Sequence, residues 1–242
     1  MGARLLLTAS FSVMVLAAAC GGDASVPEAS ISRSNAVPTA ALAVESTPKP
    51  EVIVDPNAAL AHFEAGVALQ EQGRLDQAIA AFDEAIRLNP QYGVSYVRRG
   101  GVYRQLGENR RAIRDYDAAI RVDPRNSLAF YIRGNSYYAL TQFQQAIEDY
   151  SETIRLDPQF VLVYLARGLA HNELDQHLQA IEDYDQAISL SPEFTHAFIG
   201  RALAHAALGN DEEAQKDVNR AVEFGANRDQ LEAGIEEIKG QR

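Results

Sequence analysis

The sequence is poor in the residues that build disulfide and zinc sites, and in positive charge. Its 242 residues include one cysteine and no tryptophan. A single cysteine excludes an intrachain disulfide framework and a cysteine-based zinc site. Asp and Glu number 33 against 22 Lys and Arg, which gives a formal net charge of −11. Because phosphate binding requires a basic face, we expect no nucleic acid partner.

The residue patterns of catalytic and metal sites are also missing. There is no Gly-rich phosphate loop and no motif centred on a Ser or Cys nucleophile. The histidines do not pair at helical spacing beside a carboxylate, as a metal site requires. We therefore expect neither an enzyme nor a bound metal or cofactor.

The lone cysteine, Cys20, closes an apolar N-terminal run. Arg4 is the only charge before it, and Leu5 to Ala19 carries none. A run this short matches the apolar region of a signal peptide, since a membrane span needs about 20 residues.

The segment Ala17-Ala18-Ala19-Cys20 resembles the lipobox of bacterial lipoproteins, although Ala17 stands where that family usually has Leu. The resemblance implies removal of residues 1–19, lipidation of Cys20 and an extracytoplasmic, lipid-anchored protein, with the inner and outer membranes both open. The alternative is an ordinary secretory signal cut near Ala19, with no role for Cys20.

Residues 20–55 read as the lipidated cysteine followed by a disordered tether. The segment has no aromatic residue, keeps no helical or strand period, and contains Pro27, Pro38, Pro48 and Pro50. Such a composition cannot bury enough apolar surface to offset the entropy of ordering. One apolar patch, Val52-Ile53-Val54, is an exception that could dock on the following domain.

The rest of the chain repeats every 34 residues. Proline recurs with this step at Pro56, Pro90, Pro124, Pro158 and Pro192. In phase with it come a small residue (Gly66, Gly100, Gly134, Gly168, Ala202), an alanine (Ala78, Ala112, Ala146, Ala180, Ala214) and an aromatic (Phe82, Tyr116, Tyr150, Tyr184). A fixed period of this length is typical of helix–turn–helix repeats that stack into a solenoid.

The pattern resembles the tetratricopeptide repeat (TPR) family in units that start near residues 59, 93, 127, 161 and 195. The resemblance implies an all-α, right-handed superhelical solenoid of five TPR units over residues 56–228. Residues 229–242 are expected to form a C-terminal capping helix that enters through a capping box at Asp229. Eleven helices and no sheet follow.

Two packing expectations follow from the repeat. The glycine at position 8 of a unit should face the small alanine at position 20, because a glycine inside a helix is tolerated where helices approach closely. Gly73, Gly107 and Gly209 fall between the two helices of their units, where a left-handed cap favours glycine.

Position 7 carries a row of arginines, and position 23 of the same units carries a row of aspartates. The first unit lacks both, having Ala65 and Ala81. This joint presence predicts structural ion pairs within each unit, and a row of arginines open to an acidic ligand is the alternative. The pairs are Arg99 with Asp115, Arg133 with Asp149, Arg167 with Asp183, and Arg201 with Asp217.

The TPR resemblance also implies a peptide-binding groove on the concave face of the first helices. The family's groove positions give a largely apolar set, which we call the groove set: Phe63, Val67, Val97, Arg104, Tyr131, Asn135, Tyr138, Leu165, Leu169, Asn172 and Ile199. An apolar groove suits an amphipathic helix or an extended apolar segment. Alternatively these residues are core, or are covered by Val52-Ile53-Val54 or by a second copy of the chain.

Together these patterns predict a membrane-anchored adaptor whose partner is another protein or peptide in the bacterial envelope. The second hypothesis is a structural or self-associating solenoid lipoprotein without a client peptide.

Overall fold

The computed structural model describes residues 55–241. The predictions for the signal peptide, for Cys20 and for the tether up to residue 54 therefore lie outside the described residues.

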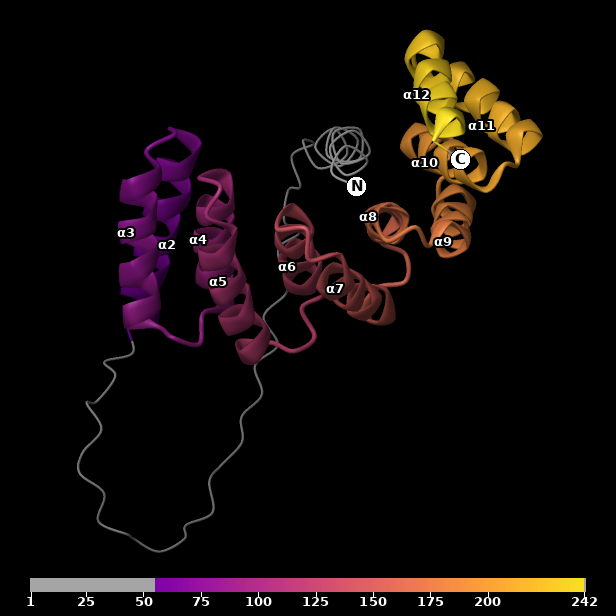
Figure 1. Ribbon diagram of the computed structural model, residues 1–242. Helices are drawn as coiled ribbons and strands as arrows, with labels where there is room; N and C mark the ends of the chain where they lie inside the picture. The colour runs from indigo at the N-terminus through magenta and orange to yellow at the C-terminus, as the bar shows by residue number, and fades with distance from the viewer. Residues whose placement is uncertain (1–54, 242) are drawn as a thin grey trace, which may run out of the picture.

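The described residues form eleven helices and no strand, which confirms the all-α solenoid (Figure 1). The helices are α2 (Pro56–Glu71), α3 (Leu75–Leu88), α4 (Gly93–Gln105), α5 (Asn109–Val122), α6 (Ser127–Ala139), α7 (Phe143–Leu156), α8 (Val161–Glu173), α9 (His177–Leu190), α10 (Thr195–Leu208), α11 (Asp211–Glu223) and α12 (Arg228–Gly240). Consecutive helices pack as five antiparallel hairpins, and each hairpin packs mainly against the next one along the chain.

The turn inside each hairpin passes through one left-handed residue. Gly73, Gly107 and Gly209 have φ of 72°, 77° and 82°, which confirms the expected caps. Thr141 and Asp175 take the same place in the third and fourth hairpins, with φ of 58° and 57°. The left-handed turn is therefore kept even where the residue carries a side chain, at the cost of some strain.

The glycine at position 8 lies against the aromatic ring at position 24, whereas its predicted approach to the alanine at position 20 stays a prediction. A Cβ built on Gly134 would approach Cε1 of Tyr150 to 2.7 Å, and one on Gly66 would approach the Phe82 ring equally closely. The ring at position 24 is almost fully buried in each case. The glycine is needed because the ring leaves no room for a methyl group.

The last helix, α12, closes the C-terminal end of the solenoid. It packs on α10 and α11 through Leu231 and Ile235, both buried. The capping box predicted at Asp229 is wrong: the helix begins at Arg228, and the side chain of Asn227 accepts the hydrogen bond from the backbone N–H of Gln230. An Asn there satisfies the free N–H groups of the first turn, so the cap lies two residues earlier.

Candidate protein-binding face

The arginines of position 7 each grip the aspartate of their own hairpin with two hydrogen bonds. Arg133 on α6 donates from Nε and Nη2 to the two carboxylate oxygens of Asp149 on α7, at 2.8 and 2.6 Å. Arg99 with Asp115, Arg167 with Asp183, and Arg201 with Asp217 have the same geometry. Charge-assisted, two-pronged hydrogen bonds of this kind are stronger than neutral ones and fix the geometry of both side chains.

Each arginine also reaches back to the preceding hairpin, a contact that the sequence reasoning missed. The Nη1 atom of Arg133 donates to Asp117 on α5 at 2.6 Å, and Arg201 reaches Asp185 in the same way. Arg99 makes the equivalent contact with Asp83. A signal was present, because Asp83, Asp117 and Asp185 lie on the same 34-residue step.

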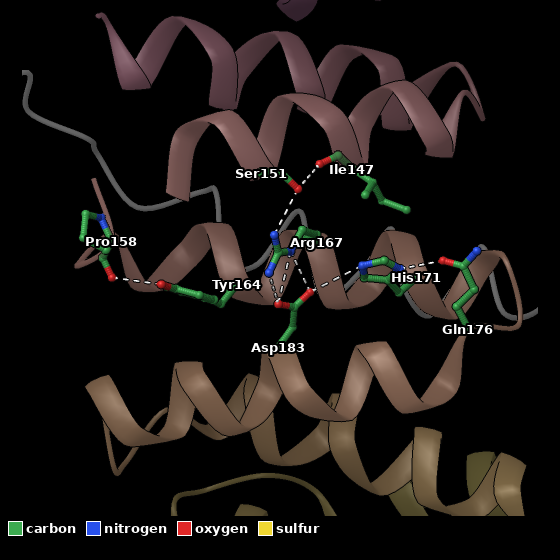
Figure 2. Close-up of polar contacts among 8 residues, drawn as sticks. All are labelled: Ile147, Ser151, Pro158, Tyr164, Arg167, His171, Gln176 and Asp183. Carbon is green, nitrogen blue, oxygen red and sulfur yellow. Dashed lines mark hydrogen bonds and ion pairs between the residues drawn. The ribbon is translucent and has the colours of Figure 1, made fainter. Parts of the chain in front are cut away.

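The third hairpin has Ser151 at that position, and its hydroxyl accepts from Arg167 at 3.0 Å (Figure 2). The carboxylate of Asp183, which Arg167 also contacts, lies 3.8 Å from Nε2 of His171. The Nδ1 atom of His171 is hydrogen-bonded to Gln176. The guanidinium thus joins three consecutive helices in every case.

These contacts assign the arginine row to internal structure. The hydrogen bond to Asp149 raises the pKa of the Arg133 guanidinium, against the effect of its burial. The side chain of Arg133 is 19% exposed, and that of Asp149 is 7% exposed. A guanidinium held on two sides is not open to an acidic ligand, so the structure offers no support for that alternative.

The middle of the groove set is buried, which corrects the expectation that these residues line an open groove. Tyr131, Tyr138, Leu165 and Leu169 belong to the largest hydrophobic cluster, and Leu165 is 1% exposed. Tyr131 packs edge-on against Phe160, with ring centroids 4.7 Å apart. Neighbouring aromatic side chains fill the space here, so these positions are core.

The polar members of this middle section are satisfied internally. Asn135 accepts a hydrogen bond from the hydroxyl of buried Tyr150 at 2.9 Å. Tyr138 donates to Glu173 at 3.1 Å, and Asn172 donates to the hydroxyl of Tyr184 at 3.0 Å. Burial raises the pKa of Tyr184 well above its ordinary value, so its hydroxyl stays neutral. These contacts stabilise the fold and leave little capacity for a ligand.

The N-terminal section of the predicted groove, on α2 and α4, is more open. Two apolar residues there that are not members of the groove set are exposed: Leu60 on α2 by 43%, and Val94 on α4, its equivalent one repeat later, by 37%. Three further apolar side chains of these two helices are half-buried: Phe63, Val67 and Val97. Phe63 and Val67 also pack on the small N-terminal cluster, as half-buried Ile199 of the fifth unit packs on the C-terminal cluster.

Two residues of α4 complete this section. Arg104 is exposed, and its guanidinium lies beside the hydroxyl of Tyr116. Gly101 is one that sequence reasoning did not select, because a residue without a side chain gives no apolar or polar signal. A Cβ built on Gly101 would meet no atom within 4 Å. We name this surface the α2–α4 face, formed by Leu60, Phe63, Val67, Val94, Val97, Gly101 and Arg104.

Residues 55–241 contain no group of three or more His, Cys, Asp or Glu side chains placed to hold a metal ion. In the same part of the chain, no helix combines the length and the hydropathy needed to cross a membrane.

Comparison with protein families identifies the repeat. Tetratricopeptide repeat profiles match residues 59–92 and, in overlapping segments, residues 97–159, 133–192 and 165–229. No curated protein matches the chain.

Several solved structures share the fold. MamA is 26% identical, with a TM-score of 0.66 over 69% of this chain and 92% of its own. A tetratricopeptide repeat protein from Parabacteroides merdae is 20% identical, with a TM-score of 0.68 over 75% of this chain and 72% of its own. YrrB, described as a TPR protein with an unusual peptide-binding site, is 19% identical, with a TM-score of 0.64 over 72% of this chain and 89% of its own.

Proposed function

The chain belongs to the tetratricopeptide repeat family, and from this premise we propose that it is a protein-interaction scaffold whose α2–α4 face binds an apolar or amphipathic segment of another protein. The observation that carries the proposal is the exposure of Leu60 and Val94 beside half-buried apolar neighbours on two adjacent first helices. Exposed apolar side chains that gather on one face mark interaction sites on soluble domains.

The site differs from the one that the sequence alone favoured. The middle of the solenoid supplies the rigid support, since its aromatic and ion-paired side chains contact one another. The N-terminal hairpins supply the contact surface. The likeness to YrrB supports peptide binding only through the shared fold, because its identity of 19% is low. A scaffold needs no catalytic group, and we propose no enzymatic activity.

We further propose that the scaffold is held on the extracytoplasmic side of a bacterial membrane by lipid on Cys20. The support is the sequence Ala17-Ala18-Ala19-Cys20 after an uncharged apolar run. Several acyl chains anchor a protein stably, because each buried CH₂ contributes about 0.8 kcal/mol. Replacement Cys20→Ser should abolish labelling by palmitate and move the protein out of the membrane fraction. Unchanged labelling would refute the anchor.

A structural, self-associating solenoid is the second candidate, and the edge of α2 favours it. Ala61 and Ala68 are exposed, whereas the equivalent Ser95 and Val102 one repeat later are fully buried by the preceding hairpin. Another copy could pack on this edge, as one repeat packs on the next.

Crosslinking separates the two candidates. A photoreactive residue in place of Val97, on the full chain in native membranes, should capture a partner protein, and Val97→Asp should prevent its co-purification. The matched control is the same residue in place of Arg114, exposed on the second helix α5. Equal capture from both positions would contradict the α2–α4 face. If the solenoid self-associates instead, Ala65→Glu should change its oligomeric size, whereas Val97→Asp should leave that size unchanged.

A further inference from the structure

We propose that Gly101 and Arg104 form a two-part recognition site on the α2–α4 face, in which a bulky apolar side chain of the ligand enters the space above Gly101 and a neighbouring Asp or Glu pairs with Arg104. This inference rests on the proposed function and names the ligand class: a partner segment with an apolar anchor and a carboxylate within one helical turn of it.

The space above Gly101 is specific to the second repeat. The equivalent residues of the other units all carry side chains: Val67, Asn135, Leu169 and Leu203. Asn135 and Leu169 are buried and contribute to the core. Gly101 alone has no side chain at this repeat position, and a Cβ there would have no neighbour within 4 Å. The backbone φ is not in the left-handed region. The turn geometry therefore does not require glycine at this position, and tight packing does not require it either.

Gly100, the preceding residue, shows the opposite situation. A Cβ on Gly100 would lie 2.6 Å from Cε1 of Tyr116, so the glycine is needed for packing. Glycine inside a helix is unfavourable relative to alanine. The fold thus explains Gly100, whereas Gly101 lowers helix stability without a packing reason. A ligand side chain that fills the gap supplies the missing reason.

Arg104 lacks the partner that its equivalent has one repeat later. Tyr138 in the third repeat donates to Glu173, which lies 35 residues further on in the next first helix. The residue 35 positions after Arg104 is Ala139, which is exposed and has no polar side chain. The contact with the Tyr116 hydroxyl uses only part of the five donors of a guanidinium. The remaining donors suit a carboxylate.

The spacing of the two groups sets the spacing in the ligand. Gly101 and Arg104 are separated by about 4.5 Å along α4, and the arginine side chain adds reach along the same face. An anchor and a carboxylate three or four residues apart on a ligand helix meet both groups at once. The chain is acidic overall, with a net charge of −11, so the attraction of a carboxylate is local to Arg104.

The experiment measures binding of two labelled peptides to the purified full chain by fluorescence anisotropy. Each peptide is an 18-residue amphipathic helix with a leucine face, and the two differ only by one Glu or Gln four residues from the central leucine. We expect the Glu peptide to bind about fivefold more tightly than the Gln peptide. In Arg104→Gln this preference should vanish. The control Arg121→Gln, on the exposed side of α5, should keep it.

Gly101→Leu fills the gap from the protein side. We expect it to weaken both peptides by at least about tenfold, since the anchor loses its place. Its melting temperature should equal or exceed that of the wild type, because leucine favours the helix and has room. Gly100→Ala should lower the melting temperature and serves as the control that shows this region responds to crowding.

The outcomes separate this inference from the proposed function. Equal binding of both peptides by the wild type, or unaffected binding by Gly101→Leu, overturns the recognition site. If Val97→Asp still prevents partner co-purification in that case, the proposed function stands. If peptide binding becomes tighter after Val52, Ile53 and Val54 are all replaced by Ser, the chain's own segment is the occupant and the inference is overturned. The inference is also overturned if sedimentation shows a dimer of the chain that does not bind the peptides.

Discussion

At the residue scale, the arginine row shows how one side chain joins two repeats. Arg133 contacts Asp149 in its own hairpin and Asp117 in the preceding one. A buried ion pair contributes little net stability, but separating it is costly because an unpaired charge stays behind. The two aspartates differ in burial, with side chains 7% and 35% exposed. Their replacement should therefore have unequal effects.

Asp149→Asn should lower the free energy of unfolding by about 2 kcal/mol or more, because it leaves Arg133 half-buried with its main partner neutralised. Asp117→Asn should cost less than about 1 kcal/mol, as expected for a more exposed pair. Urea denaturation of both variants measures the difference. Equal losses would show that the two contacts are energetically alike and would contradict the ranking by burial.

We expect the half-buried His196 to make stability depend on pH. Burial lowers its pKa below the ordinary value of 6.5. The folded state then binds the proton less readily than the unfolded chain. The full free energy of unfolding is therefore kept above pH 6.5, and part of it is lost as the pH falls from 6.5 through the pKa of His196 in the folded state. His196→Gln should lose less stability than the wild type between about pH 7.5 and 5. Thermal melts at both values test this, and parallel losses would refute it.

Sequence reasoning succeeded at residues whose partners lie at a fixed offset, and failed where burial depends on neighbouring repeats. The pairing of Arg99 with Asp115 could be inferred because the first unit has neither an arginine at position 7 nor an aspartate at position 23. The burial of Tyr131 could not, because it depends on where Phe160, the residue before α8, places its ring. Gly101 was missed because its importance lies in an absent side chain.

At the element scale, the capping helix α12 replaces the repeat that would follow the fifth. It buries Leu231 and Ile235 against a cluster that includes Phe198 and Val218. The pattern of apolar residues along α12 was enough to predict the helix, but its start was misplaced by the acidic Asp229. Local hydrogen bonding at Asn227 fixed the start instead.

Leu231→Asp should therefore destabilise the C-terminal end by about 2–4 kcal/mol, since it loses apolar burial and places a charge in the cluster. Hydrogen exchange should show the loss chiefly in α10 and α11. The control Glu237→Asp, at an exposed position of the same helix, should leave exchange unchanged. A uniform loss over all hairpins would indicate that the solenoid unfolds as one unit.

At the scale of the whole molecule, the repeat period made the architecture predictable, whereas the distribution of the core along it was not. Five units with one pattern imply four similar interfaces between successive units. The structure instead concentrates its largest cluster of buried side chains between α6 and α10, while the clusters of α2–α5 are small. The extra aromatic and leucine side chains of the third and fourth units cause this difference.

The uneven core predicts that local stability rises from the N-terminal hairpins to the middle of the solenoid. Opening of a repeat costs free energy in proportion to the apolar contacts it breaks, so backbone amides of α6–α9 should exchange most slowly and those of α2 and α3 fastest. Hydrogen exchange with mass spectrometry on the full chain measures this directly. The proposed ligand face lies on the less stable hairpins, and a ligand that binds only the folded form should slow exchange there first. Uniform protection along the solenoid would contradict the gradient, and slowing confined to α8–α11 would place the ligand elsewhere.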